Sequence, residues 1–181
     1  NFGGVKTDGT LWTWGNNADA GLGQNDKVYR SSPTQVPGTQ WSSIEMGGGA
    51  FYGIKTDGSL WVCGSNIGGE LFYNSTTNVV SPAPVQVPGT QWSSVSGGDL
   101  WALALKTDGT LWVSGYNSNG QFGQNDAIPR SSPTQIPGTQ WSSANANGKI
   151  AYGIKTDGTL WAWGTGYGGG LGKNEGMIHR S

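Results

Sequence analysis

The chain has 181 residues, including 33 glycines and 10 tryptophans, and its formal net charge at pH 7 is −1. A charge this close to zero argues against nucleic acid or an anionic membrane surface as a partner, and no apolar run approaches the roughly 20 residues that cross a bilayer. Only 12% of the residues are charged, but the tryptophans and the regularly placed leucine, isoleucine and valine supply a core, which excludes a disordered chain.

A seven-residue motif recurs along the chain and sets its organisation. The motif Lys-Thr-Asp-Gly-(Thr/Ser)-Leu-Trp begins at Lys6, Lys55, Lys106 and Lys155. A second motif, Pro-Gly-Thr-Gln-Trp-Ser-Ser, begins at Pro37, Pro88 and Pro137. Repetition at a period of about 50 residues predicts a repeat architecture. We therefore treat residues 1–181 as a single repeat domain, with units of approximately 1–40, 41–91, 92–140 and 141–181.

The second unit illustrates the strands that we expect in each unit. Residues 41–46 alternate apolar and polar side chains, as a half-buried strand does, and residues 50–55 form the next strand after three glycines. An Asp-Gly pair then precedes the apolar residues 59–64, which is the strongest short signal for a β-hairpin. Residues 83–88 indicate an outer strand, because prolines are tolerated at a sheet edge. Four short antiparallel strands per unit predict an all-β chain of β-propeller blades.

The chain begins inside one unit and stops inside another, so it holds about three and a half blades. A propeller closes by pairing strands from its two ends, which hides the edges of its sheets. An isolated arc of this composition would expose tryptophan-rich faces. We therefore expect a partial ring, the fragment of a longer protein, completed by further blades from the same or another chain.

The motifs resemble the repeat of the regulator-of-chromosome-condensation family. The best match is Ala104-Leu-x-x-Asp-Gly-x-Leu-Trp-x-x-Gly-x-Asn-x-x-Gly-Gln-Phe-Gly123, and similar residues extend over the whole chain. The resemblance implies a seven-bladed propeller with repeats of about this length. It also implies guanine-nucleotide exchange on small GTPases as one function, but the loops that this activity needs have no recognisable counterpart here. Where the family often has a histidine before the Ala-Leu pair, this chain has Ala50, Trp101 and Ile150.

The repeated acidic and aromatic residues have structural roles in this interpretation. Each Asp-Gly pair recurs once per unit where a hairpin turn needs a positive φ, which favours a turn over a metal ligand or an acid–base catalyst. These predicted turn residues are Asp8, Gly9, Asp57, Gly58, Asp108, Gly109, Asp157 and Gly158. Tryptophans that recur in every blade are expected to pack between sheets.

Residues that depart from the repeat are the candidate binding residues. Trp101 has no counterpart in the other units, although a buried filler is the favoured interpretation of it. Asn74 begins an Asn-Ser-Thr sequence in the divergent loop 71–80, where a chance glycosylation sequon is favoured over a used one. Four tyrosines in loops complete the candidates: Tyr29, Tyr73, Tyr116 and Tyr167. Loops on a rigid scaffold are where propellers carry specific function.

Catalytic and metal-binding groups are not apparent. Cys63 is the only cysteine and lies in an expected strand, and His179 is the only histidine. Neither has the partners that a nucleophilic or metal site requires, so we expect no enzyme activity, no metal and no cofactor. Arginines recur before the serines that open the outer strands, and we expect them to brace the long loops through backbone carbonyls. They are Arg30, Arg130 and Arg180.

The sequence therefore predicts a non-enzymatic β-propeller scaffold for protein–protein interaction. Its low charge and its surface rich in serine, threonine, asparagine and glycine suggest a secreted, cell-surface or virion-appendage protein. Three alternatives stay open: a guanine-nucleotide exchange factor, a propeller that inhibits β-lactamases through aromatic loop residues, and a lectin that binds glycans. Acceleration of nucleotide release, enzyme inhibition and selective glycan binding would distinguish them.

Overall fold

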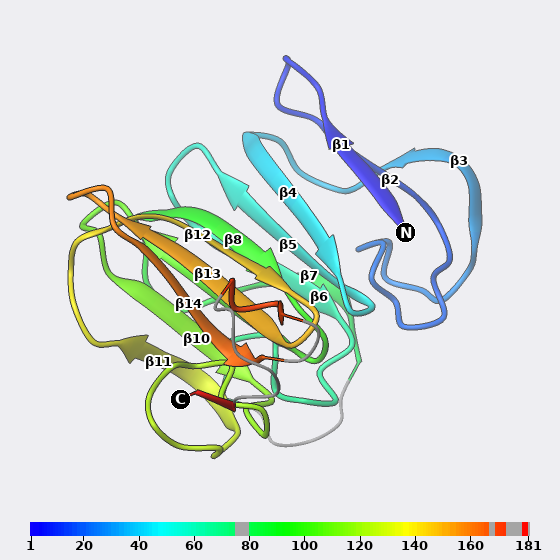
Figure 1. Ribbon diagram of the computed structural model, residues 1–181. Helices are drawn as coiled ribbons and strands as arrows, with labels where there is room; N and C mark the ends of the chain where they lie inside the picture. The colour runs from blue at the N-terminus through cyan, green and yellow to red at the C-terminus, as the bar shows by residue number, and fades with distance from the viewer. Residues whose placement is uncertain (75–79, 167–168, 173–178, 181) are drawn as a thin grey trace.

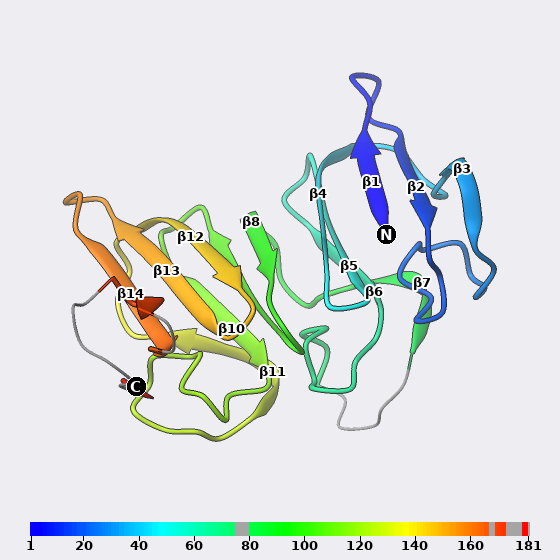
Figure 2. The same ribbon diagram turned by 45° about the vertical axis from the view of Figure 1, so that its right-hand side comes forward.

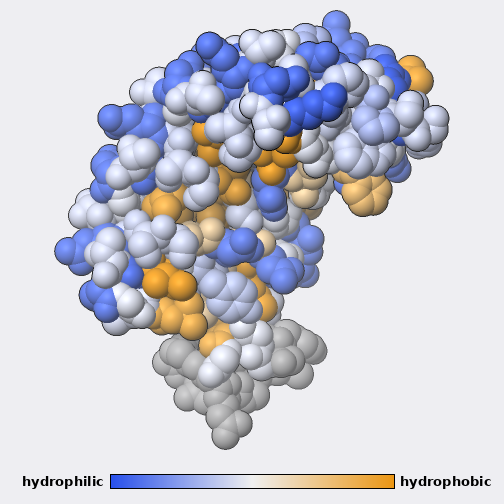
Figure 3. All heavy atoms as spheres, turned by 90° about the horizontal axis from the view of Figure 1, so that it is seen from above, coloured by the Kyte–Doolittle hydropathy of each residue, from blue (hydrophilic) through white to orange (hydrophobic). Residues whose placement is uncertain are grey.

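The computed structural model describes residues 1–74, 80–166, 169–172 and 179–180. In this part of the chain the strands form four antiparallel sheets that follow one another along the sequence (Figure 1 and Figure 2). Seen from above, the molecule has the outline of an open arc (Figure 3). The predicted all-β chain of propeller blades in a partial ring is thus confirmed.

The first two sheets contain residues of the first two repeat units. The first sheet is three-stranded, with the order β1-β2-β3, and comprises β1 (Phe2–Val5), β2 (Leu11–Gly15) and β3 (Arg30–Gln35). The second has the order β4-β5-β6-β7 and comprises β4 (Trp41–Gly47), β5 (Ala50–Lys55), β6 (Leu60–Gly64) and β7 (Ser81–Gln86). The outer strand therefore begins two residues earlier than the sequence predicts.

The last two sheets repeat this pattern. The third comprises β8 (Trp92–Gly97), β9 (Trp101–Lys106), β10 (Leu111–Gly115) and β11 (Arg130–Ile136). The fourth comprises β12 (Trp141–Asn147), β13 (Ile150–Lys155), β14 (Leu160–Thr165) and β15 (His179–Arg180). A tryptophan opens the first strand of each four-stranded sheet, and β1 has no such strand beside it among the described residues.

The Asp-Gly pairs lie in the turns between the second and third strands of a full blade, and their side-chain contacts are repeated. In the first turn Oδ1 of Asp8 accepts the N–H and the hydroxyl of Thr10, at 2.9 and 2.6 Å. The same Thr10 hydroxyl accepts the indole N–H of Trp12 at 3.0 Å. Gly9 has a φ of +78°, which glycine adopts without steric cost. Corresponding contacts recur at Asp57, Asp108 and Asp157.

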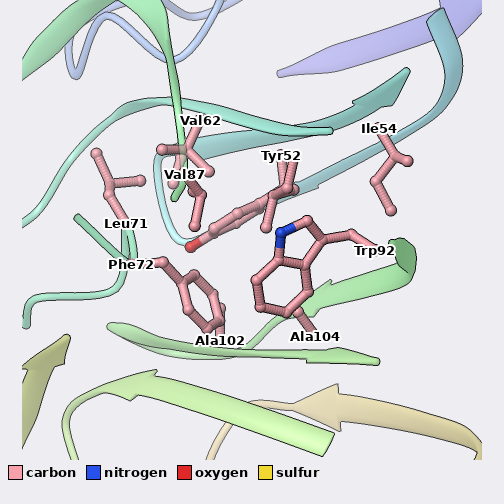
Figure 4. Close-up of a cluster of buried hydrophobic side chains, with 11 residues drawn as sticks. Tyr52, Ile54, Val62, Leu71, Phe72, Val87, Trp92, Ala102 and Ala104 are labelled. Carbon is pink, nitrogen blue, oxygen red and sulfur yellow. The ribbon is translucent and has the colours of Figure 1, made fainter. Parts of the chain in front are cut away.

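The hydrophobic core lies between successive blades. Trp92 opens the third blade and is 3% exposed, and it packs against Ile54 and Leu60 of the second blade (Figure 4). Its backbone N–H donates to the carbonyl oxygen of Gly58 at 3.0 Å, so a turn of one blade holds the first residue of the next. Trp41 and Trp141 are also buried and donate in the same way to the carbonyls of Gly9 and Gly109.

A lysine joins the first and third strands within each full blade. In the second blade Nζ of Lys55 lies 5.0 Å from the ring centroid of Trp41 and 4.3 Å from that of Trp61. The two indoles meet edge to face at 6.5 Å. The third and fourth blades have the same arrangement around Lys106 and Lys155. Such cation–π contacts contribute about 0.5–1 kcal/mol each at exposed sites.

Candidate interaction surface

Three long loops leave the blades on the same side of the arc, because each connects the last two strands of its sheet (Figure 2). They contain large apolar side chains that face solvent. We call this set the loop surface, and it consists of Val28 (60% exposed), Tyr29 (63%), Ile67 (58%), Tyr116 (38%) and Ile128 (62%). Apolar side chains gathered on one side of a rigid scaffold are typical of protein-binding surfaces.

An ion pair holds the exposed tip of the first loop. The guanidinium of Arg30 donates to Oδ2 of Asp26 at 2.6 Å and to the carbonyl oxygen of Val28 at 2.7 Å. Oδ1 of Asp26 accepts the backbone N–H of Val28 at 2.9 Å. That N–H and the Arg30 guanidinium lower the pKa of the Asp26 carboxyl. Both backbone groups of Val28 are therefore fixed while its side chain stays in solvent.

The third blade carries the same arrangement. Arg130 donates to Oδ2 of Asp126 at 2.6 Å and to the carbonyl oxygen of Ile128 at 3.0 Å. Asp126 accepts the N–H of Ile128 at 3.0 Å, and the Arg130 guanidinium is the main cause of its lowered pKa. We call these two units, Asp26–Arg30 and Asp126–Arg130, the loop clamps. The predicted arginine–carbonyl contacts are present at both, and the side chain of Arg180 lies outside the described residues.

An asparagine ties each clamp to the body of its loop. The side-chain amide of Asn17 donates to the carbonyl oxygen of Asp26 at 2.9 Å, and its Oδ1 accepts the N–H of Leu22, also at 2.9 Å. Asn117 makes the same contacts with Asp126 and Phe122. Leu22 and Phe122 are fully buried, so each loop is anchored in the core. The exposed apolar residues thus project from an ordered backbone.

The loop of the second blade differs from that of the third in having a buried glutamate. Glu70 is 1% exposed, and its Oε2 accepts the N–H of Gly68 at 2.7 Å. Burial raises the pKa of its carboxyl. Gln121 occupies the equivalent position of the third blade, where its Oε1 accepts the N–H of Asn119 at 2.8 Å. A neutral amide fills the same structural role there without the cost of burying a charge.

The candidate binding residues lie in different surroundings. Tyr29 and Tyr116 belong to the loop surface, whereas Tyr73 is half-buried and packs against the core. Asn74 is exposed and has a φ of +55°, and its backbone N–H donates to Ser131 of the next blade at 3.1 Å. Tyr167 lies outside the described residues.

Trp101, the other candidate, is fully buried. Its indole N–H donates to the carbonyl oxygen of Gly148 at 2.6 Å and its ring packs against Phe122. It therefore presents no surface to a ligand in this structure, and the buried position corresponds to the packing role that the sequence favours.

Sequence reasoning missed the exposed aliphatic residues and the acidic half of each clamp. Val28 and Ile128 both stand two residues before the arginine of an Arg-Ser-Ser sequence, and an aspartate stands four residues before that arginine. This spacing was the available signal. Aromatic residues are enriched at interfaces, which favours the loop tyrosines over these aliphatic residues when only the sequence is known.

Metal ligands and reactive thiols each need particular surroundings in a fold. No group of three or more His, Cys, Asp or Glu side chains within the described residues is placed to hold a metal ion. Cys63 is buried, and burial raises the pKa of its thiol to about 12. A thiol of this pKa is not a nucleophile near neutral pH. No described helix has the length and apolar character that a membrane crossing requires.

Comparison with known proteins shows that two segments of the chain match models of a known repeat. Residues 8–50 match the model of the regulator of chromosome condensation (RCC1) repeat, and residues 92–121 match a second model of that repeat. Human WBSCR16 superposes with a TM-score of 0.84 at 20% identity, covering 97% of this chain and 48% of that one. Comparison with curated protein sequences gave no match.

Two structures of yeast RCC1 (Prp20) are similar as well. The one bound to Kap60 gives a TM-score of 0.79 at 20% identity and covers 97% of this chain and 44% of that one. Prp20p from Saccharomyces cerevisiae, described with its binding to Gsp1p and histones, gives 0.79 at 19% identity, with 97% and 46% covered. The chain thus spans just under half the length of these structures, and at such identity the likeness shows the fold.

Proposed function

We propose that this chain, two segments of which match models of the RCC1 repeat, is a non-enzymatic propeller scaffold that binds a protein partner through the loop surface. The observation that carries this proposal is the pair of loop clamps. In each clamp an Asp–Arg ion pair, supported by an asparagine, fixes the backbone of one exposed apolar residue, Val28 or Ile128. An ordered apolar side chain loses little conformational freedom on binding, which favours affinity.

The character of the surface favours a protein over a charged ligand. Within the two clamps Asp26 pairs with Arg30 and Asp126 with Arg130, which leaves Lys27 as the remaining charged residue there. The exposed clamp residues are Lys27, Val28 and Tyr29 in the first loop and Ala127, Ile128 and Pro129 in the third, so most of them are apolar. Protein interfaces combine such apolar centres with a polar rim. We extend the proposal to a secreted, cell-surface or virion component, on the strength of the low charge content of 12%.

The test compares capture of protein partners by three forms of the chain. A double variant, Val28→Asp with Ile128→Asp, changes two exposed residues and is expected to leave the fold intact while abolishing capture. The control is Val85→Asp, because Val85 is an exposed apolar residue, 44% accessible, on the outer strand β7. Equal capture by the wild type and the double variant would refute the role of the loop surface, as would equal loss in the control.

The same preparations separate the alternative functions. Accelerated nucleotide release from a small GTPase would replace the scaffold proposal by an exchange factor, the activity that the family resemblance implies. Selective binding on a glycan array or inhibition of a β-lactamase, in each case lost in the double variant, would keep the loop surface and change the partner.

A further inference from the structure

We propose that a groove between the loops of the second and third blades accepts a lysine side chain of the protein partner, with the buried carboxylate of Glu70 as the opposite charge. The inference rests on the scaffold function proposed above and names a residue type that the partner presents. Residues 66–69 of the second loop and 129–131 of the third line this groove, which we call the inter-loop groove. Its volume is about 200 Å³.

Contacts between the two loops hold the walls of the inter-loop groove in place. The backbone N–H of Asn74 donates to the carbonyl oxygen of Ser131 at 3.1 Å, and the hydroxyl of Ser114 donates to the carbonyl oxygen of Gly69 at 2.6 Å. A Cβ at Gly69 would lie 2.8 Å from the Cα of Ser131, so the loops approach each other through a glycine. A side chain that enters the groove therefore does not have to order its walls, which favours affinity.

The size and lining of the groove suit a single long side chain. Pockets that take small-molecule ligands have volumes of about 300–1,000 Å³, and the inter-loop groove is smaller, at about 200 Å³. Ile67, which is 58% exposed, and Pro129 offer apolar contacts to a chain of methylene groups. Lysine side chains pack their methylene groups on such apolar surface and keep the ammonium group among polar groups.

Glu70 gives the groove the sign of its charge. It is 1% exposed, and its Oε2 accepts the N–H of Gly68 at 2.7 Å, so the carboxylate lies directly behind a residue of the groove wall. Burial raises the pKa of this carboxyl, and the groups that lower the pKa are N–H groups of its own loop and the hydroxyl of Ser65. Among the described residues no cationic side chain forms an ion pair with Glu70. A cation in the groove would therefore stabilise a buried charge that has no counter-ion.

The other charged groups at the groove neutralise each other. Arg130 donates to both carboxylate oxygens of Asp126, at 3.2 and 2.6 Å, and its guanidinium lies 5.8 Å from the ring centroid of Phe122. Within residues 65–74 Glu70 is the only charged residue. The surroundings of the groove therefore carry one negative charge when Glu70 is ionised, and an ammonium group complements that charge.

The equivalent position in the other blades shows that the loop does not need a carboxylate for its structure. Gln121 stands there in the third blade and is fully buried, and its Oε1 accepts the N–H of Asn119 at 2.8 Å. The first blade has Gly21 at this position. A neutral residue thus supports the same loop conformation, whereas a buried carboxylate adds a desolvation cost. Binding of a cation accounts for a charge that the fold itself does not require.

Two tyrosines and a second glutamate share the surroundings of Glu70. The hydroxyl of Tyr52 on β5 donates to the carbonyl oxygen of Glu70 at 3.5 Å. Burial, and after it the charge of Glu70, raises the pKa of both Tyr52 and Tyr73. Glu45 on β4 also contributes to the shift at Tyr52, and burial raises its own pKa. Near neutral pH the tyrosines are therefore uncharged, and only the two glutamates of this group gain protons as the solution is acidified.

The test needs no identified partner, because n-butylammonium reproduces the end of a lysine side chain. The probes n-butanol and butyrate have the same chain length and are neutral and anionic. Each probe is titrated into isotope-labelled protein near neutral pH, and the amide chemical shifts are followed by NMR. We expect n-butylammonium to produce saturable shifts at millimolar concentration at the amides of Ile67, Gly68, Gly69 and Ser131. Binding of n-butanol should be weaker, and that of butyrate weakest.

Two variants that remove one negative charge each assign the effect to Glu70. Glu70→Gln should weaken the binding of n-butylammonium about tenfold, to the level of n-butanol. The matched control is Asp19→Asn in the first loop, where the carboxylate is exposed, and it should bind as the wild type does. Binding to the wild type should strengthen as the pH rises above 4.5 and Glu70 loses its proton. Glu70→Gln should remove this pH dependence, although Glu45 still titrates.

Several results would overturn the inference. Equal binding of the three probes, unchanged binding by Glu70→Gln and an equal loss in Asp19→Asn would each do so. The absence of saturable shifts at the four amides would place the probe elsewhere, and tightest binding of butyrate would assign the groove to carboxylates through Arg130. None of these results bears on capture by the Val28→Asp and Ile128→Asp double variant. The scaffold function and the lysine groove can therefore fail separately.

Discussion

The four hairpin glycines allow a stability experiment in which the backbone conformation is constant and only the neighbouring blade changes. Gly9, Gly58, Gly109 and Gly158 have φ values between +76° and +82°. Replacement by alanine therefore costs the same conformational term at each position, about 1–2 kcal/mol for a non-glycine residue in the left-handed region. What differs is the space that the added Cβ would enter.

The structure ranks the steric cost at these positions. At Gly158 a Cβ meets nothing within 4 Å. At Gly58 it lies 3.0 Å from the backbone nitrogen of Gln91, and at Gly109 it clashes with the backbone carbonyl oxygen of Thr139. Gln91 and Thr139 lie in the segments that lead into β8 and β12. Backbone atoms held against a neighbouring turn yield little, and overpacking costs about 1–3 kcal/mol. We expect Gly158→Ala to lose about 1–2 kcal/mol and Gly109→Ala about 2–5 kcal/mol, with Gly58→Ala between them.

Urea denaturation followed by tryptophan fluorescence measures these free energies of unfolding. The wild type and the three variants should be compared at one temperature and should share the same slope with denaturant, so that the midpoints can be compared. Equal losses at Gly158 and Gly109 would refute the argument that the turn of one blade supports the first strand of the next. A larger loss at Gly158 than at Gly109 would show that the face of the fourth sheet formed by Ile154, Leu160 and Trp161 is covered in solution.

Three further predictions concern single side chains. Arg30→Ala should change the free energy of unfolding by less than about 1 kcal/mol, because the ion pair is partly exposed. The same variant should speed hydrogen exchange at the Val28 amide. Unchanged exchange would mean that the clamp does not order the tip of the loop. Glu70→Gln should stabilise the protein near pH 8. Burial raises the folded-state pKa of Glu70, so folding disfavours its charged form. The stability gained by Glu70→Gln should therefore shrink as the pH falls towards 4.5. Urea denaturation at several pH values measures this gain, and a gain that stayed constant would contradict the prediction. Cys63, with a pKa raised to about 12 and no exposed surface, should react with a thiol reagent only after unfolding, and stoichiometric reaction of the native protein would be evidence against its burial.

The sequence predicted the fold well because its two signals are local and repeated. The Asp-Gly pairs need only their own hairpin, in which a carboxylate such as that of Asp8 bonds to the residue two positions on. Alternation within residues 41–46 is equally local, since neighbouring side chains of a strand point to opposite faces. Such signals can be recognised in the sequence without any knowledge of the tertiary structure.

The candidate site was predicted less completely, because burial and exposure depend on neighbours that a unit does not encode. Leu60 and Leu160 stand in almost the same sequence, yet one is fully buried and the other is 70% exposed. Trp101 and Glu70 are both buried. The sequence makes Trp101 a candidate for binding and gives no signal that singles out Glu70. The Asp26–Arg30 pair follows an (i, i+4) spacing, but in a loop that spacing predicts contact only after the backbone is known.

The main contacts between blades join each sheet to the one before it and the one after it, through strands β1, β4, β5, β8, β9 and β12. Such a chain behaves as a one-dimensional lattice, in which a damaged unit is felt across at most two boundaries. When residues 1–181 are studied alone, fraying should therefore start at the first and fourth blades and progress inward. The second and third blades, supported on both sides, would be the last to lose protection and form the natural nucleus of any shortened version of this protein.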